Sequence, residues 1–243
     1  MCIRDRFINN VSTLNTGGTG AGQQFFNLNI NSSPLAVTAS NAIRVNNNLT
    51  VLTGTLAMGA NNLFTGGSVD NQGSITFTTG VLTFEASSGT KTFNPGTSSY
   101  GPITVNAPTA TIQLTGPSLS LAATRVLTIT NGTLDLNGNT ITTLANAVIN
   151  GGTLNVSAGS NLRIGAGFAL QNNGGTFRLV GTSSNPASLS VNGAGNFTFS
   201  QTSGILEALH YNVSNTSGTG LVVSGGTIHS TNNLSNGLSL IHI

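Results

Sequence analysis

The sequence predicts an all-β chain that folds as a single-stranded, right-handed β-helix, or β-solenoid, of roughly ten coils of about 20–25 residues. Three observations support this fold: short runs in which apolar and polar residues alternate, turn-forming Asn-Gly and Gly-Gly pairs between them, and internal repeats of two lengths. Gly, Asn, Thr and Ser, all poor helix formers, make up about half of the 243 residues. Tandem β-sandwich repeats are the alternative, but they require independent domains of roughly 100 residues.

The alternating runs identify the strands. A period of two between apolar and polar residues is typical of a strand with one buried face. Glycine and asparagine tolerate positive φ, so the pairs between the runs predict sharp turns. The clearest runs are Leu127–Ile129, Thr133–Leu136, Thr153–Val156, Asn161–Ile164 and Ser188–Val191, and the turns include Asn131-Gly132, Asn137-Gly138, Asn150-Gly151 and Gly174-Gly175.

A short repeat gives the length of one coil. Steps of the form Gly-Thr-apolar begin at Gly132, Gly152 and Gly175. Gly195, in Gly195-Asn196-Phe197, is the next step expected at a similar spacing. Regular spacing of this order predicts one solenoid coil per step.

A longer repeat divides the chain into modules. Leu49–Leu63 aligns without a gap to the later segment Leu127–Ile141, and every apolar strand position is kept. Phe26–Asn31 resembles Gly101–Asn106. Tyr211–Ser214 in turn resembles Phe26–Asn29. We therefore expect modules starting near residues 25, 100 and 210 within one continuous solenoid.

Aromatic residues are the expected filling of that solenoid. Large apolar side chains that recur once per coil stack in the interior. Nine phenylalanines are predicted to do so: Phe25, Phe26, Phe77, Phe84, Phe93, Phe168, Phe177, Phe197 and Phe199.

The two ends are expected to have a different origin from the body. A single short DNA element encodes both, because the reverse complement of one codon choice for Met1–Arg6 reads as the start of Leu238–Ile243. This element resembles the end sequence that a transposase adds during preparation of a sequencing library. We therefore expect 1–6 and 238–243 to be artefactual ends, and 7–237 to be a metagenomic fragment of a longer reading frame. Excluding the ends removes the sole cysteine, Cys2, and leaves five basic residues against four acids, a net charge of +1.

The low charge excludes several classes of partner. Charged residues are 5% of the chain, against about 25% in an ordinary soluble domain. Nucleic-acid binding requires clustered Lys and Arg, which the chain lacks. No run approaches the roughly 18 apolar residues of a membrane helix, so we expect no membrane insertion in this segment.

The acids are the first candidates for a catalytic set. Solenoid enzymes that degrade polysaccharides need converging carboxylates. Coil-length spacing could align Glu85, Asp135 and Glu207 on one face, but acids two coils apart are about 10 Å apart, too far for a shared metal. Asp70 lies only 15 residues before Glu85, less than one coil, and Ala57 takes the place of Asp135 in the aligned module. We therefore predict no enzyme and no catalytic residues.

Metal and cofactor sites are also not expected. Asp135–Asn139 has the alternating oxygen donors of a calcium loop, but the EF-hand positions for Gly and Glu hold Thr140 and Asn146. An Asn-Gly turn explains the segment better. His210 and His229 lack ligand partners at metal-binding spacing and are interpreted as surface residues.

Threonine pairs indicate a third class of function. Flat threonine ladders on solenoids can bind ice or a crystalline polysaccharide. The pairs Thr76/Thr78, Thr90/Thr92, Thr128/Thr130 and Thr140/Thr142 do not recur at one coil phase. High β-propensity explains them more simply.

The segments Leu127–Ile141 and Phe26–Asn31 resemble the β-strand repeats of large bacterial surface and secreted proteins, including adhesin-like and autotransporter-passenger-like chains. The resemblance implies an extracellular or cell-surface location, an elongated structural or adhesive role and no catalytic residues. The expected partners are neighbouring repeats of the same chain, and surface glycans or host or neighbouring cell surfaces contacted through parts outside this segment.

Overall fold

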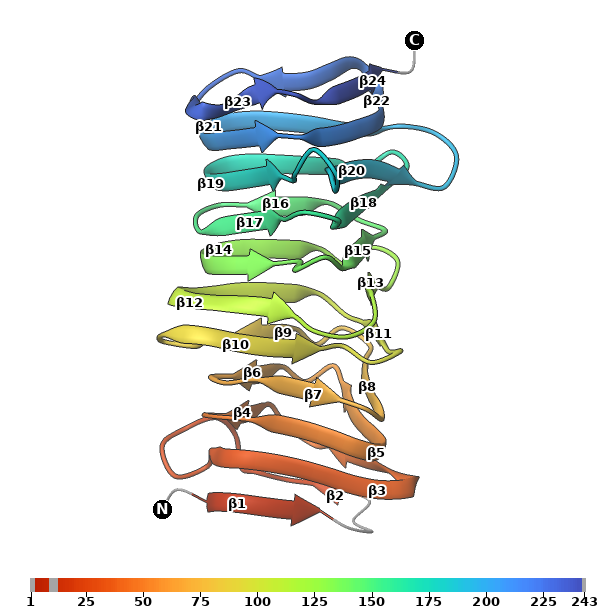
Figure 1. Cartoon of the computed structure of the whole chain (residues 1–243). Coiled ribbons are helices and arrows are strands. Elements are labelled where there is room, and N and C mark those ends of the chain that lie inside the picture. Colours follow the sequence, from red (N-terminus) through yellow and green to blue (C-terminus); the bar gives the residue numbers. More distant parts are fainter. Residues whose placement is uncertain (1–2, 9–12, 242–243) are drawn as a thin grey trace.

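A computed structural model shows a β-solenoid of about ten turns (Figure 1). It describes residues 3–8 and 13–241, with side chains for residues 13–238. Its 24 strands form one continuous sheet in which neighbouring strands are parallel, and this confirms the predicted fold class. Within the described residues there is no helix that could cross a membrane.

Each turn has three faces. In Figure 1 face 1 lies in front, face 2 at the right and face 3 behind, and the chain visits them in that order while it climbs. This makes each turn right-handed, as expected for parallel strand connections. Face 1 contains β1 (Ile3–Ile8), β7 (Val69–Asn71), β10 (Gly89–Asn94), β17 (Thr153–Val156) and β23 (Thr227–Ser235). Face 2 contains β2 (Thr13–Leu14), β8 (Ser74–Phe77), β11 (Ser99–Tyr100), β13 (Leu119–Leu121), β15 (Thr140–Thr143), β18 (Asn161–Gly165), β20 (Ala187–Asn192) and β24 (Leu238–Ile241).

The remaining strands lie on face 3 or bend across a corner. Face 3 alone holds β4 (Ile43–Val45), β6 (Leu63–Thr65), β9 (Leu82–Phe84) and β16 (Ala147–Ile149). Two strands bend from face 1 to face 2: β3 (Phe25–Ala39) and β5 (Leu49–Gly59). Four bend from face 3 to face 1: β12 (Ile103–Leu114), β14 (Leu127–Asp135), β19 (Ala169–Val180) and β21 (Phe197–Leu209). The last, β22 (Tyr211–Val223), bends from face 2 to face 3.

Strand register gives the length of each turn. Leu28, Leu49, Val69, Phe93 and Leu114 occupy the same position on successive turns. Their spacing in the sequence agrees with the predicted coil length of about 20–25 residues. One later turn is longer, since Asn172 and the residue above it, Gln201, are 29 positions apart. The extra residues lie in the connections on either side of β20.

Inward side chains form one continuous core along the axis. Six of the nine predicted phenylalanines are fully buried: Phe25, Phe84, Phe93, Phe177, Phe197 and Phe199. Phe77 and Phe168 are only partly buried. Phe26 was predicted wrongly, because it is 47% exposed. Adjacent residues in a strand point to opposite sides, and Phe25 takes the inward position.

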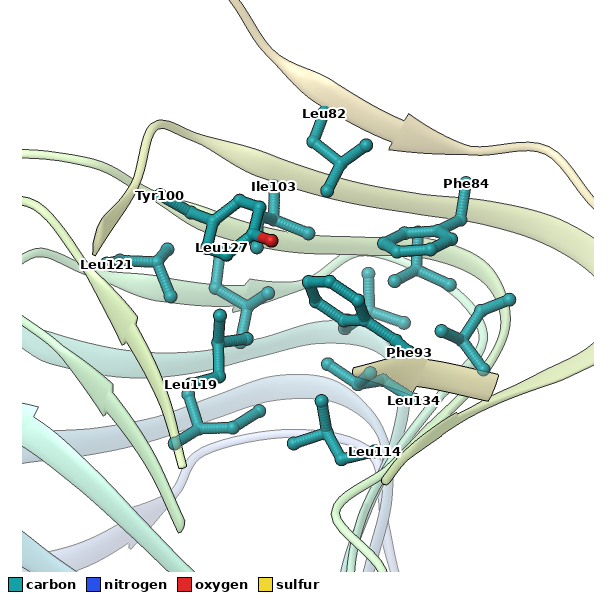
Figure 2. Close-up of a cluster of buried hydrophobic side chains, with 14 of the residues drawn as sticks. Leu82, Phe84, Phe93, Tyr100, Ile103, Leu114, Leu119, Leu121, Leu127 and Leu134 are labelled. Atoms are coloured by element: carbon teal, nitrogen blue, oxygen red, sulfur yellow. The ribbon is translucent and has the colours of Figure 1, made fainter. Parts of the chain in front are cut away.

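One part of the core is aromatic. Figure 2 shows Phe84, Phe93 and Tyr100 among leucines from neighbouring turns. The ring centroid of Phe93 lies 5.0 Å from that of Phe84 and 5.4 Å from that of Tyr100. Tyr100 is fully buried and was not among the predicted core residues.

Glycines line the corner between faces 3 and 1. Gly132, Gly152, Gly175, Gly204 and Gly226 occupy this corner on five successive turns. A Cβ on each of the last four would come within 2.1–2.5 Å of a carbonyl oxygen of the glycine one turn below. Gly204, not Gly195, follows Gly175, which corrects the predicted fourth step. Gly195 lies in the connection between β20 and β21, beside Ala166.

The long sequence repeat does not span a whole number of turns. Leu49 lies on face 1, whereas its counterpart Leu127 lies on face 3. The other module starts behave alike: Leu28 lies on face 1, Ile103 on face 3 and Val213 on face 2. Each module is therefore rotated by one face relative to the module before it.

Both terminal segments contribute strands. β1 pairs with β3, and β24 pairs with β22. Ile3–Arg6 and Leu238–Ile241 thus lie in the sheet.

Candidate functional site

The four acids of 7–237 are each engaged in the stack. Asp70 accepts hydrogen bonds from Asn94 Nδ2 and Gln72 Nε2, both at 2.8 Å. Glu85 pairs with Arg44. Asp135 and Glu207 lie on face 1 in the same column, three turns apart, or about 14 Å at the usual strand spacing. The predicted alignment of acids therefore holds for Asp135 and Glu207, and it is wrong for Glu85.

Asp135 and Glu207 belong to a row of polar side chains that we call the face 1 polar chain. It spans six successive turns and consists of Gln113, Asp135, Asn155, Arg178, Glu207 and Asn232. Asn155 Nδ2 donates to Asp135 Oδ1 at 3.0 Å, and Arg178 donates to Asn155 Oδ1 at 2.7 Å. Arg178 Nε lies 3.3 Å from Glu207 Oε2, which also accepts from Asn232 at 3.1 Å.

Charges alternate along this chain. The Arg178 cation and an asparagine lie between the two carboxylates, so like charges are never on adjacent turns. Opposite charges opposite each other on neighbouring strands stabilise a sheet, whereas like charges destabilise it. The geometry therefore accounts for these residues as contacts between turns.

Face 3 carries a second charged contact. The Arg44 guanidinium lies over the Phe64 ring, 4.6 Å from its centroid, and reaches past this ring to Glu85. Phe64 is stacked directly above Arg44 on the next turn, and Glu85 follows β9 one turn higher. The cation–π contact and the ion pair join three turns.

The suspected calcium segment is a turn. Asn137 and Gly138 both have positive φ, and the Asn137 N–H donates to Asp135 Oδ1 at 3.0 Å. The amides of Asn137 and Asn139 each donate to the carbonyl of Leu114 on the turn below. The predicted Asn-Gly turn is confirmed, and the Asp135 carboxylate and the NH2 groups of Asn137 and Asn139 are bonded within the fold.

His210 lies at a corner of the solenoid, whereas His229 lies within β23 on face 1. His210 has a positive φ of 48° between β21 and β22, and its carbonyl accepts from the Ala187 N–H. His229 Nδ1 accepts the backbone N–H groups of Thr231 and Asn232 at 3.3 and 3.1 Å. Within the described part of the chain, no three His, Cys, Asp or Glu side chains come together as a metal site would require.

Threonines form a column that was not predicted from the sequence. Thr90, Thr111, Thr133, Thr153 and Thr176 are stacked in register on face 1, and Ile205 and Thr227 continue the column. The Thr-x-Thr pairs themselves lie on different faces, as expected: Thr128 on face 3, Thr90 on face 1 and Thr140 on face 2. The sequence contains a signal for this column, because five of its six threonines directly follow a glycine.

Two buried polar clusters were also not predicted. Asn71 Nδ2 donates to Pro95 O, Ser98 Oγ and Tyr100 Oη inside the core, at 2.9–3.0 Å. Asn172 donates to Gln201 Oε1 at 3.0 Å, and both residues are fully buried. No sequence pattern distinguishes these residues, because most other Asn and Gln side chains of this chain lie on its surface.

Comparison with protein-family models, curated protein sequences and solved structures found no match. The function proposed below is therefore based on the geometry of the chain.

Proposed function

We propose that the chain is a non-enzymatic structural or adhesive segment of a secreted or cell-surface bacterial repeat protein. The observation that supports this best is the use of the four acids in 7–237. Each bonds to side chains that hold adjacent turns or a corner together. A polysaccharide-degrading hydrolase would need two of them directed at one substrate.

The mechanism would be mechanical. In a solenoid each turn contacts only its neighbours, so stability is a sum of many similar interfaces. Ten turns at about 4.8 Å make a rod on the order of 45–50 Å long. Such a segment spaces or displays a binding region elsewhere in the protein, where surface glycans or other cells would be contacted.

Individual Glu85→Gln, Asp135→Asn and Glu207→Gln variants test the choice between scaffold and enzyme. We expect the variants to unfold at lower temperature and the parent protein to release no sugar from a panel of acidic and neutral polysaccharides. Release of oligosaccharides by the parent, abolished in a variant that remains folded, would replace the proposal with an enzyme.

Recovering the contiguous genomic reading frame tests whether the chain is one segment of a longer repeat protein. We expect further modules of the same type, together with an export signal and an anchoring or sorting region. A frame that lacks further modules would contradict a role as one segment of a long surface rod.

Binding of a regular lattice is a second candidate, favoured by the threonine column on face 1. The face 1 polar chain lies beside this column, however, and its charged Asp135 and Arg178 interrupt a uniform hydroxyl surface. We expect the protein not to be retained by ice or crystalline cellulose. Retention that is lost in a Thr133→Val, Thr153→Val double variant would favour the lattice function instead.

A further inference from the structure

Six Asn-Gly pairs punctuate this chain, and they differ in how firmly the fold holds them. In such a pair the backbone nitrogen of the glycine can attack the side-chain amide carbon of the asparagine. The reaction needs a mobile peptide, because the two atoms must approach each other and the glycine N–H must lose its proton. The pairs are Asn131-Gly132, Asn137-Gly138, Asn150-Gly151, Asn173-Gly174, Asn192-Gly193 and Asn236-Gly237.

Two of the pairs are held by hydrogen bonds on both residues. Asn137 Nδ2 donates to Leu114 O at 3.1 Å, and the Gly138 N–H donates to Ser160 Oγ at 2.9 Å. At Asn150 the side-chain oxygen accepts from Asn173, and the Gly151 N–H donates to Ile129 O at 3.3 Å. Neither glycine nitrogen can attack without breaking a bond to the adjacent turn.

Three further pairs are restrained by bonding or packing. Asn131 Nδ2 donates to Asn106 Oδ1 at 2.8 Å, and a Cβ on Gly132 would lie 1.9 Å from Ala107 O. Asn173 bonds to Asn150 and accepts from Thr202. The backbone of Gly237 packs against the ring of Tyr211, 2.1 Å from where a Cβ would stand.

Asn192-Gly193 lacks all of these restraints. Within the described residues, the Asn192 side chain and the Gly193 N–H have no hydrogen-bond partner, and no atom lies within 4 Å of a Cβ built on Gly193. Gly193 and Gly195 both have positive φ and flank the exposed Ala194. Asn192 is the last residue of β20, and the connection that follows runs outside the stack (Figure 1). Glycine-rich exposed loops of this kind are the mobile parts of a fold.

We propose that Asn192 is a site of spontaneous deamidation in the folded protein, and that it reacts before the other Asn-Gly pairs. The Gly193 nitrogen forms a bond to Asn192 Cγ, ammonia leaves, and a five-membered succinimide closes. Water then opens this ring at either carbonyl and yields aspartate or isoaspartate. The net reaction consumes one water and releases one ammonia, and no other reactant is required.

The modification changes the surface of a chain with very little charge. The new carboxylate would stand near Gly165, which is paired with Asn192 on the turn below. With four acids in 7–237, one more alters the charge of this corner more than it would on an ordinary protein surface.

The test uses incubation of the folded protein at mildly alkaline pH, followed by digestion after Arg and Glu and mass spectrometry. The product spanning 179–207 contains Asn192 and no other Asn-Gly pair. We expect the acid form to accumulate there several-fold faster than at any of the three Asn-Gly pairs of the product 126–163, Asn131, Asn137 and Asn150, which fragment ions separate. In urea the pairs should react at similar rates, and Asn192→Gln should remove the signal from 179–207.

Ser160→Ala provides the converse variant, because it releases the Gly138 N–H and should accelerate reaction at Asn137. Circular dichroism before and after incubation establishes that each variant remains folded. Equal rates at Asn192 and Asn137 in the folded parent protein would overturn the proposal, as would reaction of Asn192 only after unfolding.

Discussion

Single glycines decide whether the corner between faces 3 and 1 can close. Gly152 has a φ of 55°, and a Cβ there would lie 2.5 Å from Gly132 O. Two different costs therefore meet at this position: a left-handed backbone, which disfavours any side chain, and a close approach of the turn below.

Three alanine substitutions separate these costs. Gly152→Ala should destabilise the protein by about 3 kcal/mol or more, because both costs apply. Gly89 has a positive φ but open space around it, so Gly89→Ala should destabilise the protein by about 1–2 kcal/mol. Gly218 has neither a positive φ nor a close neighbour, so Gly218→Ala should leave the stability nearly unchanged. Urea unfolding measures all three, and equal effects at Gly152 and Gly218 would contradict the corner geometry.

Ionisation of Tyr100 is expected to lower the stability of the folded chain at alkaline pH. Burial raises the pKa of the Tyr100 phenol well above its ordinary value of 10.0, although the hydrogen bond from Asn71 acts in the opposite direction. Below pH 10 the phenol is neutral in both folded and unfolded chains. Above that pH only the unfolded chain can ionise, so stability falls as pH rises.

Tyr100→Phe tests this dependence. The variant should lose about 1 kcal/mol at neutral pH through its missing hydrogen bonds, but retain more of its stability above pH 10. Burial also raises the pKa of Tyr211, so the double variant should show the weakest alkaline loss. Melting temperatures across the alkaline range measure the effect, and an unchanged profile in both variants would refute it.

At the scale of strands, stability comes from side chains stacked between turns. Phe93 is fully buried against Phe84 and Tyr100, whereas Phe26 is 47% exposed although it too lies in a strand. The contribution of each phenylalanine to stability therefore depends on how deeply its side chain is buried, and not on whether it lies in a strand.

Phe93→Ala should cost about 3–5 kcal/mol, because it opens a cavity in the aromatic part of the core. Phe26→Ala should cost less than about 0.5 kcal/mol, as for ordinary surface positions. Denaturant unfolding of the two variants makes the comparison, and a large loss in Phe26→Ala would show that the register of β3 is wrong.

The strands show why some features could be predicted from sequence and others could not. Alternation within Leu127–Ile129 or Thr153–Val156 depends on local chemistry, and the structure confirms these strands. Phe25 and Phe26 could not be separated, because only the register with Val45 decides which one points inward. The Arg44–Glu85 contact was equally inaccessible, since it joins residues 41 positions apart.

Variable turn length limits prediction of the candidate site in the same way. The step from Gly175 to Gly204 is longer than the two steps before it, so constant spacing predicts Gly195 instead of Gly204. Only part of the threonine column could be predicted, because Thr133, Thr153 and Thr176 directly follow regularly spaced glycines, whereas Thr227 lies beyond the long turn. Columns on a solenoid surface can be predicted from sequence only when each turn has the same number of residues.

At the scale of the whole molecule, the rotation of successive modules determines in which direction the surface of each module faces. Equivalent sequences at Leu28, Ile103 and Val213 lie on faces 1, 3 and 2. If further modules continue this rotation, a surface encoded once per module faces three directions in turn. Such a rod would present the same surface all round and would suit a spacer with no preferred side.

The fold depends on successive turns that stack in register along one axis. The threonine column consists of residues that occupy the same position on successive turns. Spin labels can measure this stacking directly, with Cys2 replaced by serine and one label fixed at Thr111. The second label is placed in turn at Thr133, Thr153, Thr176 and Thr227. The separation should grow by about 5 Å for each turn crossed, because parallel strands lie about 4.8 Å apart. Separations that do not increase steadily with the number of turns, as expected for tandem sandwiches, would contradict a stacked solenoid.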